Sequence, residues 1–170
     1  MPDKQAQFAR IKTLIFGVDG IFIDGRVCLL ATGEQYRTFD IKNCYSIELA
    51  LKTGFWVGIV LSTNAEGVKI WLEILGVEDI FMGGLPDQKL NAHLGYVTRD
   101  GLNESEILYM GDDIIDCPIL NRPDMLATCP ADAVEEVKVV CDYISPKPGR
   151  GGAVRDVVEQ VLKAQRKWIS

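Results

Sequence analysis

Short apolar runs without polar alternation recur along the chain and constrain its fold more than any other feature. These runs cover residues 13–18, 55–61, 79–82 and 107–110, with weaker ones at 125–128 and 140–144. Strands that are covered on both faces show this pattern, because neither face needs polar side chains. Helical periods lie between them, the clearest at 68–75 and 154–162. The alternation predicts an α/β domain whose parallel sheet is flanked by helices, with the weaker runs toward one edge.

Length and charge limit the possible functions. The 170 residues make a single domain, 1–170, and the 18 basic against 24 acidic residues give a net charge of −6. This balance argues against nonspecific binding to nucleic acid or to an anionic membrane, since both need a basic surface. No apolar run reaches the ~20 residues of a membrane span, and the polar N-terminus does not resemble a secretory signal. We therefore expect a cytoplasmic protein.

Cysteine and histidine usage agrees with that expectation. The five cysteines are scattered and never spaced CxxC, which is typical of reduced thiols rather than of a disulfide framework or a zinc site. His93 is the only histidine, which argues against a histidine metal site or a Ser/His/Asp triad. We expect His93 to be a helix-surface or packing residue.

One segment, residues 21–40, breaks the alternation directly after the first strand. Two β-rich runs joined through Gly33 predict a hairpin flap that overhangs the strand ends. The flap carries apolar residues that we expect at its surface: Ile21, Phe22, Ile23, Val27, Leu29 and Leu30. An isolated lid would expose less apolar surface, so a subunit interface is favoured over a flap that folds back on its own domain.

Polar groups follow four successive strands, where ligands of parallel sheets bind. These groups are Asp19 after the first strand, Ser62 and Thr63 after the second, Lys89 after the third, and Asp112, Asp113 and Asp116 after the fourth. Carboxylate oxygens suit Mg²⁺, whereas hydroxyl and ammonium groups suit phosphate oxygens. Asp112 and Asp116 stand four apart and would share one face of a helix beginning near residue 112.

Each of these residues also has a purely structural interpretation. Asp113 is a good N-cap, Ser62 would cap the helix after the second strand, and Lys89 alone would be a solvated surface lysine. Their joint occurrence at four strand ends favours a phosphate and metal site.

The order of these groups resembles the haloacid dehalogenase superfamily of phosphotransferases. Within it, residues 10–165 resemble the small cap-less branch of 3-deoxy-D-manno-octulosonate 8-phosphate phosphatases. The resemblance is carried by Val18-Asp19-Gly20, Asp24-Gly25, Gly33-Glu34, Phe39-Asp40, Ser62, Lys89, Gly111-Asp112-Asp113, Asp116 and the segment Gly149-Arg150-Gly151-Gly152-Ala153-Val154-Arg155-Asp156.

This resemblance implies a Rossmann-like fold without a large cap, and Mg²⁺-dependent hydrolysis of a sugar-acid phosphate from the lipopolysaccharide or sialic-acid pathway. It further implies homotetramers in which the flaps of neighbouring subunits pack together. The implied catalytic residues are Asp19, which protonates the leaving group, and Lys89. The implied phosphate-binding residues are Ser62, Thr63 and Lys89. The implied metal site comprises the backbone carbonyl of Asp19 together with Asp112, Asp113 and Asp116.

The chain departs from the family at the nucleophile. The family's first motif is Asp-x-Asp, and Gly17 stands where its first aspartate would attack phosphorus. A glycine cannot form the covalent intermediate, and the loss of one charged ligand should leave Mg²⁺ binding weakened or absent. Three other segments also differ from the branch: Lys42-Asn43-Cys44, Ser62-Thr63-Asn64 and Asp87-Gln88-Lys89.

These departures leave more than one function open. The first is a phosphatase of this family with impaired catalysis; direct attack of water on phosphorus would forfeit the nucleophile's contribution. The alternative is a non-catalytic protein that binds a small sugar phosphate or serves as an oligomeric scaffold, as similar domains fused to sialic-acid-activating cytidylyltransferases do. A receiver-like signalling domain is a third possibility, against which the flap and Gly111-Asp112-Asp113 argue.

Overall fold

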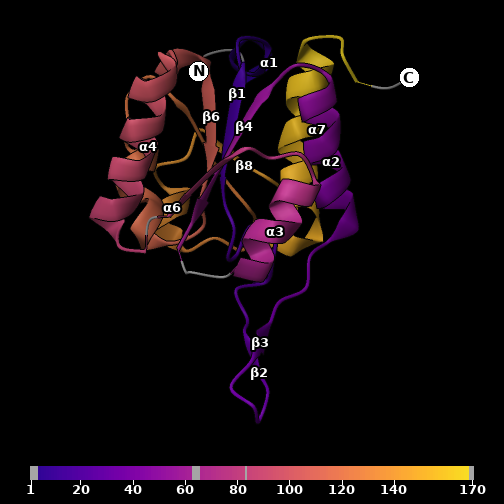
Figure 1. Cartoon of the computed structure of the whole chain (residues 1–170). Coiled ribbons are helices and arrows are strands. Elements are labelled where there is room, and N and C mark those ends of the chain that lie inside the picture. The colour runs from indigo at the N-terminus through magenta and orange to yellow at the C-terminus, as the bar shows by residue number, and fades with distance from the viewer. Residues whose placement is uncertain (1–3, 63–65, 83, 169–170) are drawn as a thin grey trace.

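The fold is built on a six-stranded parallel sheet in the order β5-β4-β1-β6-β7-β8 (Figure 1). The computed structural model describes residues 4–62, 66–82 and 84–168. The strands are β1 Thr13–Gly17, β4 Trp56–Leu61, β5 Asp79–Met82, β6 Ile107–Met110, β7 Leu126–Cys129 and β8 Tyr143–Ile144. The predicted parallel sheet is thus confirmed, and the two weaker runs form β7 and β8 at one edge.

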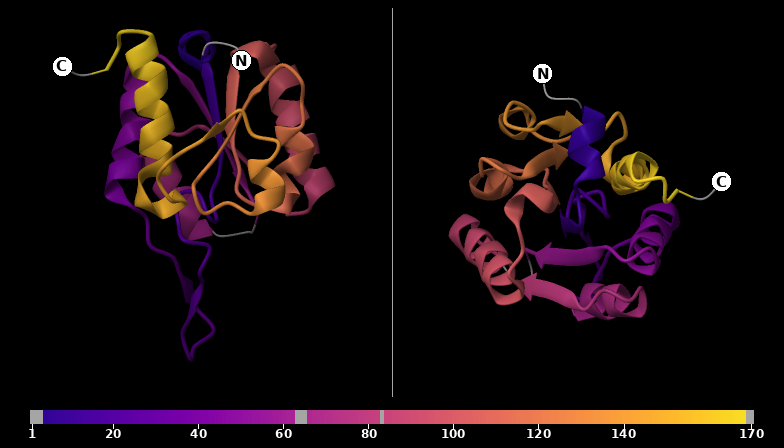
Figure 2. Two further views of the ribbon diagram at one scale, coloured as in Figure 1. Left: turned by 180° about the vertical axis from the view of Figure 1, so that it is seen from behind. Right: turned by 90° about the horizontal axis from the view of Figure 1, so that it is seen from above.

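Helices cover both faces of this sheet (Figure 2). They are α1 Lys4–Ala9, α2 Ile41–Lys52, α3 Glu66–Ile74, α4 Pro86–Asp100, α5 Cys117–Leu120, α6 Glu135–Lys138 and α7 Val154–Ala164. Residues of α1, α2, α3 and α7 form one apolar core with the sheet, and residues of α4, α5 and α6 form the other. This is the Rossmann-like arrangement that the sequence predicts. None of the helices in the described part of the chain is long and apolar enough to cross a membrane.

The segment after β1 forms an arm that projects beyond the carboxyl ends of the strands (Figure 1). Its regular pairing is short, since β2 Cys28–Leu29 pairs antiparallel only with β3 Gln35–Tyr36. Val27, Leu29 and Leu30 are exposed on it. For these three residues the predicted apolar flap surface is confirmed.

The same prediction is wrong for Ile21, Phe22 and Ile23, which are at most 1% exposed and belong to the core. Gly20, with a φ of 75°, lets the chain reverse directly after β1. The amides of residues 21–23 then donate to the carbonyl of Val18, and their side chains pack into the apolar core. A run that looks like a strand is therefore a buried turn.

Candidate functional site

The carboxyl ends of β1, β4 and β6 meet at the base of the arm, and Lys89 enters this region from the first turn of α4. Gly17 is the last residue of β1. A Cβ atom placed on Gly17 would lie 3.8 Å from Lys89 Nζ and 3.6 Å from Ile21 Cγ1. The position that lacks a side chain and the predicted phosphate-binding ammonium are therefore direct neighbours. Ser62 is half-buried at the end of β4, while Thr63 lies outside the described residues.

Lys89 is buried, not solvated, so its interpretation as a surface lysine is wrong. Its side chain is 3% exposed, and Nζ donates to Asp116 Oδ1 at 2.6 Å. A lysine is buried only when its charge is compensated, and here Asp116 supplies that compensation. Because Nζ has three donors, the Asp116 bond leaves hydrogen-bonding capacity for an anion beside Gly17.

Asp116 is fully buried, and four donors surround its carboxylate. Besides Lys89, the Tyr109 hydroxyl donates to Oδ1 at 2.7 Å, and the amides of Asp112 and Asp113 donate to Oδ2 at 3.2 and 3.4 Å. The short 3₁₀ turn Ile114–Asp116 begins only after Asp113. Asp112 and Asp116 therefore do not share a helix face, and that prediction is wrong. The Asp116 carboxylate instead turns back and holds Lys89.

Asp113 caps the 3₁₀ turn that follows it, because its Oδ1 accepts a bond from the amide of Ile114 at 2.7 Å. Its interpretation as an N-cap is thus confirmed, and its side chain is exposed.

Tyr109 is a site residue that the sequence analysis missed. It lies within the apolar run of β6, is fully buried, and its ring packs edge-on against His93 with centroids 6.1 Å apart. Burial and the neighbouring Asp116 raise the pKa of its hydroxyl well above the usual range, so Tyr109 is a permanent donor. A tyrosine in a strand buried on both faces was the available signal, because a buried phenol needs a partner.

Asp112, a predicted metal ligand, lies where the loop after β6 meets the loop after β1. Burial, followed by the proximity of Asp116, raises its pKa to about 7 although Lys89 opposes the shift, as expected for a negative charge held among other acids. Its carboxylate packs against Gly20, where an added Cβ would stand 1.7 Å from Oδ2. This contact brings the loop after β6 against the loop after β1, which carries Asp19.

The donor set fits a hard cation only in part. Asp112 offers a carboxylate, and Asp19 lies across the Gly20 contact. Asp116 is committed to Lys89, Tyr109 and two amides. Among the described residues, no group of three His, Cys, Asp or Glu side chains is arranged to hold a metal ion.

Asp19 is paired with the arm. Arg37 Nε donates to Asp19 Oδ1 at 3.3 Å, and the Arg37 side chain is only 9% exposed. Where the chain enters the arm, Arg150 Nη1 donates a hydrogen bond to Asp24 Oδ2 at 2.9 Å. The amide of Arg26, and then Arg150, hold the pKa of Asp24 below its usual range. Two ion pairs therefore fix the base of the arm to the body.

Asn43, which departs from the family pattern, has a structural role. It is fully buried, its Nδ2 donates to the carbonyl of Gly149 at 3.0 Å, and its Oδ1 accepts from the amide of Arg155 at 3.1 Å. A Cβ on Gly149 would stand 1.8 Å from the carbonyl oxygen of Gly20. The glycine-rich C-terminal segment thus supports the loop after β1.

His93, one turn after Lys89 on α4, is a packing residue as predicted. It is fully buried, and Nε2 lies 3.2 Å from Glu104 Oε1. Glu104 in turn accepts from Arg122 at 2.7 Å. Burial lowers the pKa of His93, although Glu104 opposes the shift, and this favours the neutral ring. Its Nδ1 has no hydrogen-bond partner within the described residues.

Known proteins resemble this chain over nearly its whole length, although no protein-family model matches it. The chain is 30% identical over 165 residues to the 3-deoxy-D-manno-octulosonate 8-phosphate phosphatase KdsC of Escherichia coli, covering 97% of this chain and 86% of that protein. The crystal structure of the Yersinia pestis phosphatase superposes with a TM-score of 0.90 at 28% identity, covering 96% of this chain and 86% of that one. That of the Moraxella catarrhalis phosphatase, in complex with a magnesium ion, a phosphate ion and a KDO molecule, superposes with a TM-score of 0.88 at 28% identity, covering 95% and 91%.

Proposed function

The chain belongs to the family of 3-deoxy-D-manno-octulosonate 8-phosphate phosphatases in the haloacid dehalogenase superfamily, and we propose that it binds a small sugar-acid phosphate but hydrolyses it poorly. The observation that carries this proposal is Gly17, which stands next to the buried Lys89. The group that positions a phosphate is present, whereas the group that would attack it is absent.

The proposed roles rest on the positions of Lys89 and Asp19 and, for Ser62 and Thr63, on the sequence pattern. Lys89, fixed by Asp116 and Tyr109, binds a phosphate oxygen together with Ser62 and Thr63. Charge-assisted bonds of this kind are the strong ones. Asp19 is the acid that would protonate the leaving oxygen, and it is held by Arg37.

The metal site is proposed on fewer ligands than the sequence pattern implies. The carbonyl of Asp19 and the carboxylate of Asp112 would hold Mg²⁺, with the exposed Asp113 beside them, while Asp116 contributes through Lys89. A bound Mg²⁺ would neutralise phosphate charge. Without a carboxylate at position 17 we expect its affinity to be weak.

Gly17→Asp tests the proposal directly. The contacts of 3.6–3.8 Å around an added Cβ are ordinary van der Waals distances, so a Cβ fits at position 17 without displacing its neighbours. We expect the unaltered protein to hydrolyse 3-deoxy-D-manno-octulosonate 8-phosphate far more slowly than the ~10 s⁻¹ of a typical enzyme. We expect Gly17→Asp to bind Mg²⁺ more tightly in calorimetric titration and to gain turnover.

The matched control is Gly95→Asp, which adds the same charge at an exposed position of α4 with nothing within 4 Å of its Cβ. Ordinary enzymatic turnover by the unaltered protein, free of contaminating phosphatase, would contradict impaired catalysis. Equal Mg²⁺ affinities of the unaltered protein and Gly17→Asp would show that position 17 does not lie at the metal site.

The alternative function is a non-catalytic homotetrameric scaffold in the cytoplasm. The projecting arm supports it, because Leu29 is 70% exposed and Val27 and Leu30 are more than 40% exposed. The five cysteines, none of them in a disulfide, are compatible with a reducing compartment. Light scattering at micromolar concentration tests the assembly: a species of 18.9 kDa, the mass of one chain, would exclude it. Leu29→Lys should dissociate an assembly held by the arms.

A further inference from the structure

A polar cavity of about 440 Å³, the α2–α7 cavity, lies where the helices α2 and α7 begin. The two helices lie side by side, and both start at the end of the molecule from which the arm projects (Figure 1). We propose that this cavity binds a small multivalent anion without an apolar part, such as a diphosphate or a tricarboxylate. The site goes beyond the proposed function, because Lys89, Gly17, Asp19 and Ser62 are not among its lining residues.

Three cationic side chains line the α2–α7 cavity. Lys42 is the second residue of α2, Arg155 is the second residue of α7, and Lys147 lies in the loop before α7. Within the part of the chain that the structure describes, none of the three forms an ion pair. The guanidinium of Arg155 lies over the ring of Trp168, 5.8 Å from its centroid. The three cations can therefore contact a bound anion without giving up a carboxylate partner.

The carboxylates that share the lining already have partners within the protein. The Asp40 side chain accepts a hydrogen bond at 2.9 Å from an amide in the first turn of α2, and Asp156 accepts from two hydroxyl groups at 2.8 Å each. Glu159 pairs with Lys163 at 2.6 Å. These acids lower the positive potential of the cavity without pairing with any of its three cations. An anion therefore gains most when it carries several charges and contacts two or three cations at once.

The backbone adds to the positive potential. The N-terminal ends of α2 and α7 both lie at the cavity, and each carries the partial positive charge of its helix dipole. Gly151 and Gly152 complete the lining, so this part of the wall has no side chain. Gly152 has a φ of 113°, which residues with a side chain rarely adopt. The open wall of the cavity therefore depends on glycine.

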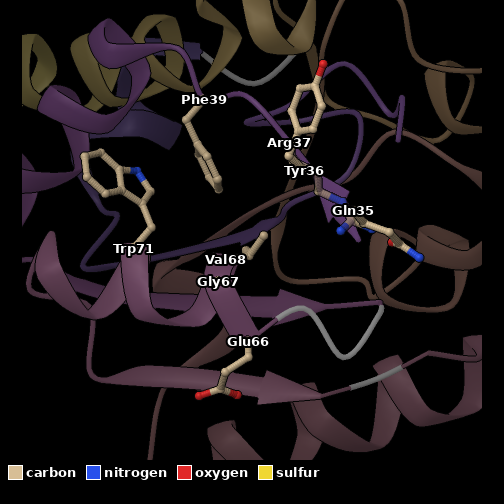
Figure 3. A pocket seen from close by; sticks show the side chains of 8 residues that line it. All are labelled: Gln35, Tyr36, Arg37, Phe39, Glu66, Gly67, Val68 and Trp71. Atoms are coloured by element: carbon tan, nitrogen blue, oxygen red, sulfur yellow. The ribbon is translucent and has the colours of Figure 1, made fainter. Parts of the chain in front are cut away.

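The class of ligand follows from what the lining lacks, since no apolar or aromatic residue contributes to it. A larger cavity of about 540 Å³, between the arm and α3, has Phe39 and Trp71 in its wall and shares no lining residue with the α2–α7 cavity (Figure 3). A ligand with an apolar face gains nothing from the α2–α7 cavity, whereas a multivalent anion can reach cations on both helices. Its volume lies within the roughly 300–1,000 Å³ of small-molecule sites.

Heteronuclear NMR titration of the isotope-labelled protein, without divalent cations, tests the site with three probes: pyrophosphate, citrate and the monovalent acetate. We expect pyrophosphate, citrate or both to shift the amide signals of Gly151 and Gly152, with an affinity that falls as the salt concentration rises. Acetate at the same concentration should leave these signals in place. The probe that shifts them identifies the ligand as a phosphate or a carboxylate. The amides of Gly17 and Gly111 report binding beside Lys89, so the two sites are distinguished.

Two substitutions locate the anion. Arg155→Gln should weaken binding of the active probe roughly tenfold, because it removes a charge-assisted hydrogen bond. Lys42→Gln should weaken it roughly threefold, because Lys42 is exposed and its charge is screened by water. Lys52→Gln is the matched control: it removes an exposed lysine from the last turn of α2, where Lys52 pairs with Glu48, and should leave the affinity unchanged.

Three results would overturn the assignment. The first is that neither pyrophosphate nor citrate shifts the amides of Gly151 and Gly152. The second is an affinity that survives both Arg155→Gln and Lys42→Gln. The third is a shift confined to the amides of Gly17 and Gly111, which would place the anion beside Lys89 and support the proposed phosphate site alone.

Discussion

The carboxyl ends of β6 and β1 are neighbours in the sheet and share one candidate site, yet they differ in how completely their polar groups are satisfied. At β6, Lys89, Asp116 and Tyr109 are buried and joined by hydrogen bonds of 2.6 and 2.7 Å. At β1, Gly17 provides no side chain, and Asp19 is 30% exposed with a 3.3 Å contact to Arg37.

This contrast separates two tasks that one active site usually combines. Holding an ammonium at a fixed position requires a buried, fully bonded carboxylate, and the β6 end has it. Attacking phosphorus requires a nucleophile at the β1 end, and Gly17 cannot supply one. The groups that we propose for phosphate binding are therefore present, whereas the nucleophile that we propose is needed for hydrolysis is absent at Gly17.

The largest loss of stability and of phosphate binding is expected from Lys89→Met, which removes the buried ion pair with Asp116 at the end of β6. The substitution leaves the Asp116 carboxylate buried without its counter-ion, and breaking a buried pair typically costs about 3–5 kcal/mol. We expect urea unfolding to show a loss of this order and phosphate binding to disappear. Lys69→Met, which removes an exposed partner of Glu73, should change the free energy of unfolding by less than about 1 kcal/mol. Equal effects of the two variants would mean that Lys89 is not the buried partner described.

Tyr109→Phe should have the next largest effect. It keeps the ring but removes one of the two side-chain donors to Asp116 Oδ1, and a hydrogen bond to a charged group contributes about 1.5–3 kcal/mol. We expect a stability loss of that size together with weaker binding of inorganic phosphate, because Lys89 is then less firmly held.

Tyr96→Phe separates positioning from simple stability. Tyr96 is also buried, but its hydroxyl donates to Asp79 at 3.0 Å, away from the site. The Tyr96→Phe variant should lose stability without losing phosphate affinity. Identical phosphate affinities of the two variants would show that Tyr109 supports the fold and does not position Lys89.

Much of the β6 end follows from the sequence, because its elements are governed by local rules. The apolar run 107–110 predicts the strand, and the group Asp112, Asp113 and Asp116 predicts polar chemistry at its end. The direction of the Asp116 carboxylate could not be predicted. It depends on where the following turn begins and on the approach of Lys89 from a helix 27 residues away in sequence.

The conformation of the chain after β1 is harder to predict, because it also depends on tertiary packing. Ile21-Phe22-Ile23 satisfies the pattern of a strand, and only tertiary packing shows that Gly20 turns these side chains into the core. Gly17 itself is obvious in the sequence once the motif around Asp19 is recognised. Its proximity to Lys89, in contrast, is a property of the fold.

His93 lies one turn after Lys89 on α4, and we expect its contribution to the pH dependence of stability to be smaller than the effects above. Burial lowers its pKa in the folded protein, so the unfolded chain binds more protons once the pH falls below the ordinary value of about 6.5. This contribution to stability is complete above that pH and is lost as the pH falls toward the lowered pKa.

Urea unfolding at pH 7.5 and pH 5.5 measures that contribution. We expect the unaltered protein to lose more stability between the two values than His93→Gln loses. Asp112, whose raised pKa of about 7 acts in the opposite direction, is common to both proteins and cancels in the comparison. A pH dependence that is unchanged in His93→Gln would mean that the pKa of His93 is the same in the folded protein as in the unfolded chain.

The smallest change in stability is expected from Arg37→Met, which removes the ion pair with Asp19 at the end of β1. Partly exposed ion pairs contribute about 0.2–1 kcal/mol, and the 3.3 Å contact with Asp19 is long for a charge-assisted bond. We expect global stability to change within that range, while amides of the arm exchange hydrogen faster because the ion pair with Asp19 no longer holds the base of the arm. Arg150→Met, which removes the other tie to Asp24, should behave alike. A loss of several kcal/mol in Arg37→Met would mean that the β1 end is as firmly held as the β6 end. Gly17 would then be one absent side chain in a rigid site, and Gly17→Asp should restore turnover without further changes.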